Sequence, residues 1–200
     1  DELNSVSDNP AFFPETETIV HGGNVHGEPV AMAMDSLKIA VVKLTMLLER
    51  QLNFLVHDGI NGLLPAFLND RTPGVDFGFQ GAQFTATSTT AHSQSLSFPM
   101  SVHSITCNRD NQDIVSMGFD AACMATETVA NGAGVSAMTA MAAAEATRIL
   151  GVDDILSPET NEFLGQVRED AYAAGTGVAV FTDAFQKVQK DLYPGVFQTI

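Results

Sequence analysis

Basic residues are scarce in this sequence. The 200 residues include 9 Lys and Arg against 24 Asp and Glu, which gives a formal net charge of −15. A field of that sign repels the phosphates of nucleic acids and of anionic membrane surfaces. Nucleic acid and membrane are therefore excluded as expected partners.

Cysteine is also scarce, and no segment looks like a membrane span or a signal peptide. Cys107 and Cys123 are the only two cysteines, and they form no C-x-x-C pair. Thiols in that pattern favour a reducing compartment over a disulfide framework. The most apolar segments carry too many Ser, Thr, Lys and Glu residues to cross a bilayer. We expect a soluble, cytoplasmic protein.

An initiator methionine is absent as well, because the sequence begins with Asp1. We expect from this a cleaved or processed product. The alternative is a boundary introduced for expression, or a lost tag. With 45% hydrophobic residues the chain can bury one sizeable core. One compact unit is the default expectation, unless the chain is part of something larger.

A long helix is predicted from Asp35 to about Val56, where apolar residues recur at spacings of three and four. The pattern assigns four charged residues to a narrow polar face: Lys38, Lys43, Glu49 and Arg50. Residues 1–34 contain prolines and a Gly-Gly pair, and they are expected to form loops, with short strands possible near Thr18 to Val20. This helix is predicted to be mostly buried.

The segment from Phe77 to Asn108 contains no charged residue and is rich in Ser, Thr and Gln. Small hydroxylated side chains permit close approach of neighbouring helices and can bond back to their own carbonyl groups. We interpret the segment as a helix inside a large bundle. A Thr-rich strand is the competing interpretation.

Further helices are expected toward the end of the chain. No proline interrupts residues 113–150, where Gly132 and Gly134 mark a kink or a close contact. Ser157-Pro158-Glu159 predicts the start of a helix toward Tyr172, and a last helix is expected from Thr182 to Leu192. The fold class is predicted to be all-α, with 1–34 as an active-site loop segment, 35–151 as a central long-helix bundle and 152–200 as C-terminal helices. Helices this long indicate oligomerisation.

The stretch NRDNQDIVSMG, residues 108–118, has more hydrogen-bonding side chains than a helix start needs. One capping side chain satisfies the first free N–H groups, so Asp110 or Asn111 would suffice. The surplus includes Asn108 and Gln112. It indicates a role beyond capping.

A second dense cluster is HGGNVHGE, residues 21–28. Its candidate metal ligands, His21, His26 and Glu28, match no standard spacing, and the glycines match no phosphate-binding loop. We expect no metal. The glycines are more simply explained by tight turning and close backbone approach to a ligand or partner.

Taken in order, several stretches make a stronger signal than each does alone. They are NSVSDNP, HGGNVHGEPVAMAMD, the ER of the long helix, GLLPAFL, GFQGAQFTA, SVHSI and NQDIVSMG. This succession resembles the histidine and aromatic amino-acid ammonia-lyase and aminomutase family. The resemblance extends from about Asn4 to about Gly151.

The resemblance implies a fold, a cofactor and a partner. Members of the family are helical, fumarase/aspartase-like homotetramers that carry 4-methylidene-imidazol-5-one (MIO), formed from an Ala-Ser-Gly tripeptide. This sequence contains no Ala-Ser-Gly. In the family that tripeptide, the catalytic tyrosines and the carboxylate-binding arginine precede the part that this chain matches. The chain therefore resembles a C-terminal part that is active only with an N-terminal, MIO-bearing chain.

The resemblance also assigns roles to residues of both clusters. The position of Gln112 is glutamate in histidine ammonia-lyases and glutamine in enzymes acting on phenylalanine or tyrosine. A neutral amide has no reason to prefer imidazole, so Gln112 indicates an aromatic substrate. Asn108 matches several bacterial tyrosine-type enzymes. Both residues are expected to face the active site, whereas Asn111 and Asp113 fix the helix start.

In the second cluster, Asn24 matches a Gly-Asn-Phe motif whose phenylalanine lies near the substrate ring. Here that position is Val25, which enlarges the pocket and leaves the substrate open. Asn9 and Glu28 match polar positions that line or support the cavity. We therefore expect Val25, Asn24, Asn9 and Glu28 to be substrate-binding residues.

The reaction implied is loss of ammonia from an L-aromatic amino acid, phenylalanine or tyrosine, to give an arylacrylate. An aminomutase would use the same parts and return the amine to the β-carbon. Two alternatives stay open: a histidine ammonia-lyase, and a non-catalytic helical oligomerisation scaffold. The sequence does not decide between lyase and aminomutase, between phenylalanine and tyrosine, or between cleavage and separate encoding.

Overall fold

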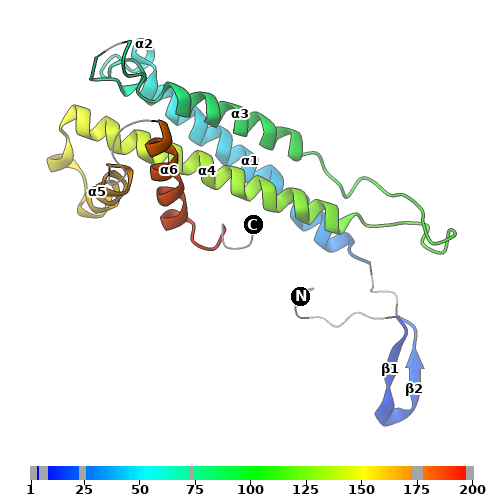
Figure 1. Ribbon diagram of the computed structural model, residues 1–200. Helices are drawn as coiled ribbons and strands as arrows, with labels where there is room; N and C mark the ends of the chain where they lie inside the picture. Colours follow the sequence, from blue (N-terminus) through cyan, green and yellow to red (C-terminus); the bar gives the residue numbers. More distant parts are fainter. Residues whose placement is uncertain (1–3, 5–8, 23–25, 73, 173–177, 197–200) are drawn as a thin grey trace. The chain divides into compact units, whose positions relative to one another are not determined.

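The computed structural model describes residues 4, 9–22, 26–72, 74–172 and 178–196, and there the chain is almost wholly helical (Figure 1). The one sheet in this part of the chain pairs two antiparallel strands, β1 (Ala11–Phe13) and β2 (Thr18–Val20). The predicted all-α class is confirmed. So is the short strand expected near Thr18 to Val20.

The described helices are, in chain order, α1 (Glu28–Val56), α2 (Asp58–Asn61), α3 (Gln80–Leu96), α4 (Gly118–Leu150), α5 (Pro158–Tyr172) and α6 (Val178–Leu192). Short 3₁₀ turns lie at Pro14–Thr16, Ala66–Leu68 and Asp153–Ile155. Within the described ranges, no helix combines the length and the apolar character that crossing a membrane requires.

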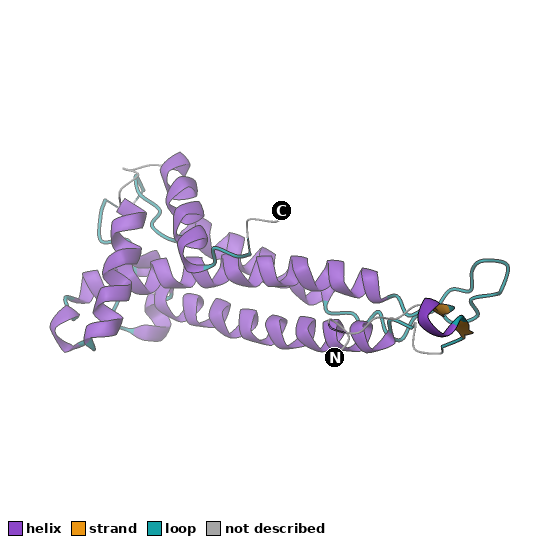
Figure 2. Ribbon diagram, turned by 90° about the horizontal axis from the view of Figure 1, so that it is seen from below, coloured by secondary structure: helices purple, strands orange, loops and turns teal. Residues whose placement is uncertain are grey.

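The chain forms two compact units. Unit 1 consists of Asp1–Ala40 and Leu96–Glu127, and unit 2 consists of Val41–Ser95 and Thr128–Ile200. Helices α1 and α4 each have residues in both units. Within unit 2, the parts of α1 and α4 that belong to it and helix α3 lie side by side (Figure 1, Figure 2). The Thr139 hydroxyl of α4, for example, donates a hydrogen bond to the Leu48 carbonyl of α1 at 3.2 Å.

Two apolar clusters form the core of unit 2. The first contains Leu52, Val56, Leu64, Leu68, Ala82, Ala86, Val135, Met138, Ala142 and Ala146. The second contains Ala137, Met141, Ala144, Leu164, Val167, Ala184 and Val188. Burial of these side chains removes apolar surface from water, the main force that stabilises a helical bundle.

Residues 80–96 of the charge-free segment fold as helix α3, so the helix prediction is right for this part and the Thr-rich strand is wrong. Residues 97–108 of the segment are not helical. Side chains of α3 bond directly to α1. Gln83 donates to Asn53 Oδ1 at 2.9 Å, and Thr87 donates to Glu49 Oε1 at 2.8 Å. The buried positions of α3 are all small: Ala82, Ala86, Thr90 and Ser93.

Helix α4 is continuous from Gly118 to Leu150, so of the two predictions for Gly132, a kink or a close contact, the contact is right. A Cβ atom at Gly132 would lie 2.9 Å from Thr45 Oγ1 and 3.1 Å from Val41 Cγ1. Real Cβ atoms essentially never come closer than 3.0 Å to a heavy atom of a neighbouring segment. Only glycine therefore allows α1 and α4 their present approach in unit 2.

Helix α1 begins at Glu28, before the expected Asp35. Its predicted polar face is wrong in part, because Lys38 is completely buried and Glu49 is nearly so. Both charges have partners, without which burial would be costly. Conversely, several large apolar side chains of α1 are exposed by 39–56%: Leu37, Ile39, Leu44, Leu47 and Phe54. The helix that was predicted to be mostly buried is only half covered within this chain.

The last two helices lie in unit 2 and follow the prediction closely. Ser157 caps α5, since its hydroxyl accepts a hydrogen bond from the Thr160 N–H at 3.2 Å, and Pro158 is the first helical residue. Helix α6 begins at Val178 rather than at Thr182. An ion pair between Lys187 and Asp170 joins α6 to α5.

Candidate functional site

Unit 1 brings the two polar clusters of the sequence together. The His26 Nε2 atom lies 3.2 Å from the carbonyl oxygen of Ile114, close enough to donate a hydrogen bond to it. A Cβ atom at Gly27 would lie 2.9 Å from Ser116 Oγ, and one at Gly118 would lie 3.0 Å from the Gly27 carbonyl oxygen. Of the glycines in the second cluster, Gly27 does allow a close approach, but to residues 116–118 of the same chain. Approach to a ligand or partner stays a prediction.

The amide-rich stretch forms a tight turn closed by Cys107 and Gln112. These two residues exchange both backbone hydrogen bonds, at 3.1 and 3.3 Å. Between them, the Asn111 N–H donates to the Asn108 carbonyl at 3.2 Å. Helix α4 starts later, at Gly118, so the prediction that Asn111 and Asp113 fix the helix start is wrong.

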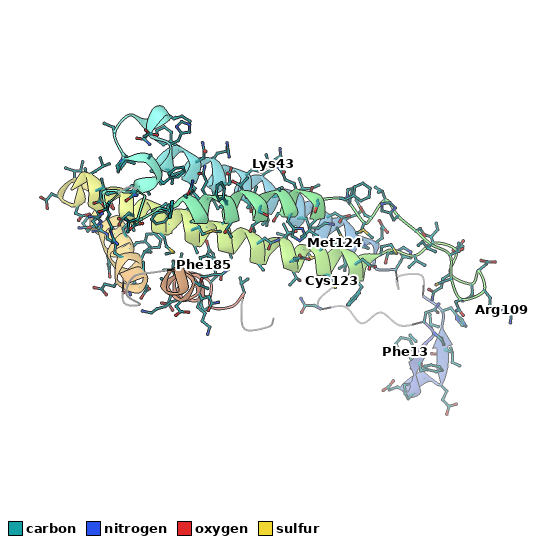
Figure 3. The ribbon with its side chains drawn as sticks, turned by 45° about the horizontal axis from the view of Figure 1, so that its top comes forward. Phe13, Lys43, Arg109, Cys123, Met124 and Phe185 are labelled. Atoms are coloured by element: carbon teal, nitrogen blue, oxygen red, sulfur yellow. The ribbon has the colours of Figure 1, made fainter. Side chains whose placement is uncertain are left out.

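The backbone of this turn is strained. Asn108, Arg109 and Asp110 have φ angles of 55°, 55° and 63°, in the left-handed region that side chains other than glycine seldom adopt. Asn and Asp tolerate this region better than Arg does. Arg109 lies at the tip of the loop and points away from the helices of unit 1 (Figure 3). Consecutive residues of this kind persist only where surrounding bonds hold them, and they are often found at functional sites.

A buried ion pair anchors the segment from which this turn arises. Lys38 Nζ lies 2.7 Å from Asp35 Oδ1 and donates a hydrogen bond to the Phe98 carbonyl at 2.9 Å. The second carboxylate oxygen of Asp35 accepts a hydrogen bond from the Ser101 N–H at 2.8 Å. Lys38 also lies 3.9 Å from the sulfur of Met124 on α4. The pair thus ties together three stretches of unit 1.

The electrostatics of this anchor favour the charged carboxylate. Burial raises the pKa of Asp35, but the hydrogen bonds from Lys38 and from the backbone of Ser101 outweigh it and lower the pKa from 3.8 to about 2. Asp35 is therefore ionised at any ordinary pH, and the Lys38 ammonium always has its counter-charge.

The predicted site residues lie in unit 1, but not all of them converge. Glu28 is half-buried in the first turn of α1, next to the junction with residues 114–118. Asn108 and Gln112 are exposed in the turn, and Asn9 is exposed in a bend before β1. No hydrogen bond among the described residues joins Gln112 or Asn108 to Glu28. Asn24 and Val25 lie outside the described residues.

Three contributors to the site were missed by sequence reasoning. Asp35 and Lys38 carried a signal, because charges at i and i+3 within an apolar pattern can form a buried pair. Ser104 carried none, yet its hydroxyl accepts a hydrogen bond from the Val115 N–H at 2.8 Å and fixes the exit from the turn.

The turn of unit 1 exposes three neutral amides, those of Asn108, Asn111 and Gln112. The described part of the chain contains no group of three or more His, Cys, Asp or Glu side chains arranged for a metal ion. The side chains that unit 1 exposes in the turn include neutral amides, which can bond to carbonyl oxygens and N–H groups without ionising. The sequence contains no Ala-Ser-Gly tripeptide.

Comparison with known proteins identifies relatives across most of the chain. The family model for aromatic amino acid lyases matches residues 1–169, which extends past the limit near Gly151 expected from the sequence. An MIO-dependent tyrosine 2,3-aminomutase from Streptomyces globisporus is 42% identical over 167 residues, 84% of this chain and 31% of the relative. A histidine ammonia-lyase from Treponema denticola is 44% identical over 151 residues, 76% of this chain and 30% of the relative.

The fold has the same relatives. The structure of a phenylalanine aminomutase from Pantoea agglomerans superimposes with a TM-score of 0.85 at 32% identity. That alignment covers 96% of this chain and 37% of the other. The chain spans about a third of the length of the relatives that it matches.

Proposed function

This chain belongs to the aromatic amino acid lyase family, and from that premise we propose that it forms part of an MIO-dependent ammonia-lyase or aminomutase. The substrate is an L-aromatic amino acid, tyrosine or phenylalanine. The lyase reaction removes ammonia and leaves an arylacrylate, and the aminomutase reaction returns the amine to the β-carbon. MIO, when present, supplies the electrophile for this chemistry.

The observation that carries the proposal is the meeting of the two polar clusters in unit 1. The His26 to Ile114 contact and the packing of Gly27 on Ser116 place the start of α1 beside the segment that carries Gln112. The proposed site combines the exposed neutral amides of the turn with the half-buried Glu28 carboxylate. The carboxylate stands in the first turn of α1, where the helix dipole favours a negative charge.

The proposed roles follow from side-chain chemistry. Gln112 and Asn108 donate and accept hydrogen bonds around the substrate without adding charge, which suits a phenyl or phenol ring. By the resemblance, Asn24, Val25, Asn9 and Glu28 are the proposed substrate-binding residues. The base that removes the β-proton is not assigned to this chain.

The substrate proposal depends on Gln112. A histidine ammonia-lyase relative is 44% identical to this chain, so overall similarity does not separate imidazole from phenyl substrates. A glutamate can ionise and bind a ring N–H, whereas a glutamine cannot ionise. We therefore favour phenylalanine or tyrosine over histidine.

The proposed partners are the part that carries Ala-Ser-Gly and further copies of the assembly, in a tetramer. The apolar side chains exposed on α1 support this, since a monomer rarely leaves such a row in water. Beside them in unit 2 is a depression of about 420 Å³, lined by Arg50, Gln51, Phe54, Leu55, Thr139 and Ala143. We propose that the partner segments cover this surface and that activity requires them.

The first test is intact mass spectrometry of the native assembly. The proposal expects a companion chain or segment that contains Ala-Ser-Gly and is lighter than its sequence mass by the water lost on forming MIO. If this chain alone makes up the assembly, the enzyme proposal fails and the non-catalytic helical scaffold becomes the better account.

The second test addresses the substrate in the same assembly. Gln112→Glu should reduce turnover of tyrosine and phenylalanine at least tenfold, because it places a carboxylate beside an apolar ring. Gln186→Glu makes the same change at an exposed position of α6 and should leave turnover unchanged. Turnover of histidine by the unaltered assembly, in preference to tyrosine and phenylalanine, would overturn the substrate proposal.

A further inference from the structure

Cys107 makes a side-chain contact that the proposed function does not use. Its Sγ donates a hydrogen bond to Gln112 Oε1 at 3.4 Å, in addition to the two backbone bonds between these residues. A thiol is a weak donor and sulfur forms long hydrogen bonds. The contact is nevertheless specific, because it joins the two residues that close the turn.

This contact engages the oxygen end of the Gln112 amide. The last torsion of a glutamine side chain is broad and roughly two-fold, so an unrestrained amide can present either its oxygen or its nitrogen. When Oε1 accepts the hydrogen bond from the thiol, the two N–H donors of Nε2 are the ones left for a ligand. No other described hydrogen bond engages that nitrogen.

The backbone conformation of the turn also depends on the pair Cys107 and Gln112. Asn108, Arg109 and Asp110 have left-handed φ angles, which cost free energy unless the ends of the turn are fixed. The Cys107 and Gln112 backbone bonds fix the ends of the turn, and the thiol then fixes the orientation of the side chain. Cys107 thus helps to fix both the conformation of the loop and the orientation of the Gln112 amide.

We propose that Cys107 is a positioning residue whose thiol holds the Gln112 carbonyl oxygen and so presents the amide N–H₂ to the substrate ring. This inference rests on the proposed function of Gln112. A donor at that point favours a ring that carries an acceptor, the phenol oxygen of tyrosine, over the unsubstituted ring of phenylalanine. Cys107 is therefore a determinant of specificity that acts through its neighbour.

The test uses the native assembly, the double variant that combines Cys107→Ala with Gln112→Ala, and four single variants: Cys107→Ala, Cys107→Ser, Cys123→Ala and Gln112→Ala. Cys123, exposed on α4, is the matched control. The ratio of kcat/KM for tyrosine to that for phenylalanine should fall roughly two- to fivefold in Cys107→Ala, the size expected for one weak hydrogen bond. Cys107→Ser keeps a donor and should hold the ratio within about twofold of the parent value, and Cys123→Ala should not change it.

Two further readouts separate positioning from a general structural role. In a Gln112→Ala background, Cys107→Ala should have no additional effect on the ratio, because the group that it positions is gone. The infrared S–H stretching band that disappears in Cys107→Ser should lie at lower frequency than the band lost in Cys123→Ala. The Cys107 band should move to higher frequency in Gln112→Ala.

The inference is overturned if Cys107→Ala leaves the ratio unchanged or if its effect on the ratio persists in full in the Gln112→Ala background. It is also overturned if the frequency of the Cys107 S–H band is the same in Gln112→Ala as in the parent. An assembly that turns over neither amino acid would instead refute the proposed function. In that case the infrared band still decides whether the thiol holds the amide, so the two failures are distinguishable.

Discussion

Unit 2 buries both apolar clusters of the described chain, whereas unit 1 contains neither of them and has several polar contacts. In unit 1 these contacts are the Asp35 to Lys38 ion pair, the His26 to Ile114 hydrogen bond and the closed turn at Cys107 and Gln112. Apolar burial is nondirectional, while hydrogen bonds and ion pairs specify geometry. The unit that carries the proposed site therefore depends more on contacts of fixed direction, whereas unit 2 combines such contacts, for example between α1 and α3, with its apolar clusters.

The two units also differ in backbone strain. Five described residues other than glycine have positive φ in unit 1: Glu17, Asn108, Arg109, Asp110 and Met117. Unit 2 has two among the described residues, Phe67 and Leu68. Strain of this kind needs compensation from neighbouring contacts. We infer that unit 2 contributes most of the stability, whereas unit 1 contains a defined loop whose left-handed φ angles cost free energy.

The strongest test of this comparison is Lys38→Met. The change leaves the Asp35 carboxylate buried without its partner, and breaking one side of a buried pair costs about 3–5 kcal/mol. Urea unfolding should show that loss. Lys43→Met removes an exposed lysine from the same helix and should change the free energy of unfolding by less than about 0.5 kcal/mol. Equal effects of the two changes would mean that the ion pair does not hold unit 1.

Acid should weaken unit 1 through the same carboxylate. The folded pKa of Asp35, about 2, lies below its ordinary value of 3.8. Its contribution is therefore complete above pH 3.8 and is lost as the pH falls toward about 2, a change on the order of 2 kcal/mol. Comparing unfolding of the parent and Asp35→Asn across this window isolates the effect. If both lose stability in parallel as the pH falls, Asp35 is not responsible.

A pair of glycine substitutions probes the packing of unit 2. Gly132→Ala places a Cβ 2.9 Å from Thr45 Oγ1, and the resulting overpacking should outweigh the gain in helix propensity by about 1–2 kcal/mol. Gly165→Ala on α5 meets nothing within 4 Å and should stabilise the protein by roughly 0.5–1 kcal/mol. Thermal unfolding checks both signs. Stabilisation by both changes would show that α1 and α4 are less tightly packed than described.

The smallest effects come from two serines with the same role in different units. Ser157→Ala removes the cap of α5 in unit 2, and Ser104→Ala removes the acceptor for the Val115 N–H in unit 1. Each should cost about 1 kcal/mol locally. Hydrogen exchange should accelerate at Thr160 in the first variant and at Val115 in the second. Acceleration across the whole chain in the Ser104 variant would contradict a local role.

Helix content was predictable because periodicity is local. The spacing of apolar residues identified α1, and the Ser-Pro-Glu signal located α5 to the residue. The identities of buried and exposed faces were less predictable. Lys38 and Leu37 exchange their expected environments because burial depends on neighbouring segments that lie far away in the sequence.

The candidate site was predictable in composition and not in geometry. Surplus amides and glycines marked the two clusters, and the resemblance gave Gln112 its proposed role. Nothing in the sequence indicated that residues 108–110 adopt left-handed φ angles or that helix α4 begins only at Gly118. Turn conformation depends on the Cys107 to Gln112 closure, a contact between residues with no hydrophobic pattern.

The unbroken course of α4, from Gly118 to Leu150, limits how the gene for this chain can change in length. One codon inserted within it would turn every later side chain by roughly 100° about the helix axis. Gly132 would no longer pack against Thr45, and the α4 alanines of both apolar clusters would no longer point into the core. Insertions and deletions accepted during evolution should therefore fall in the loops, such as residues 69–79, and spare this helix.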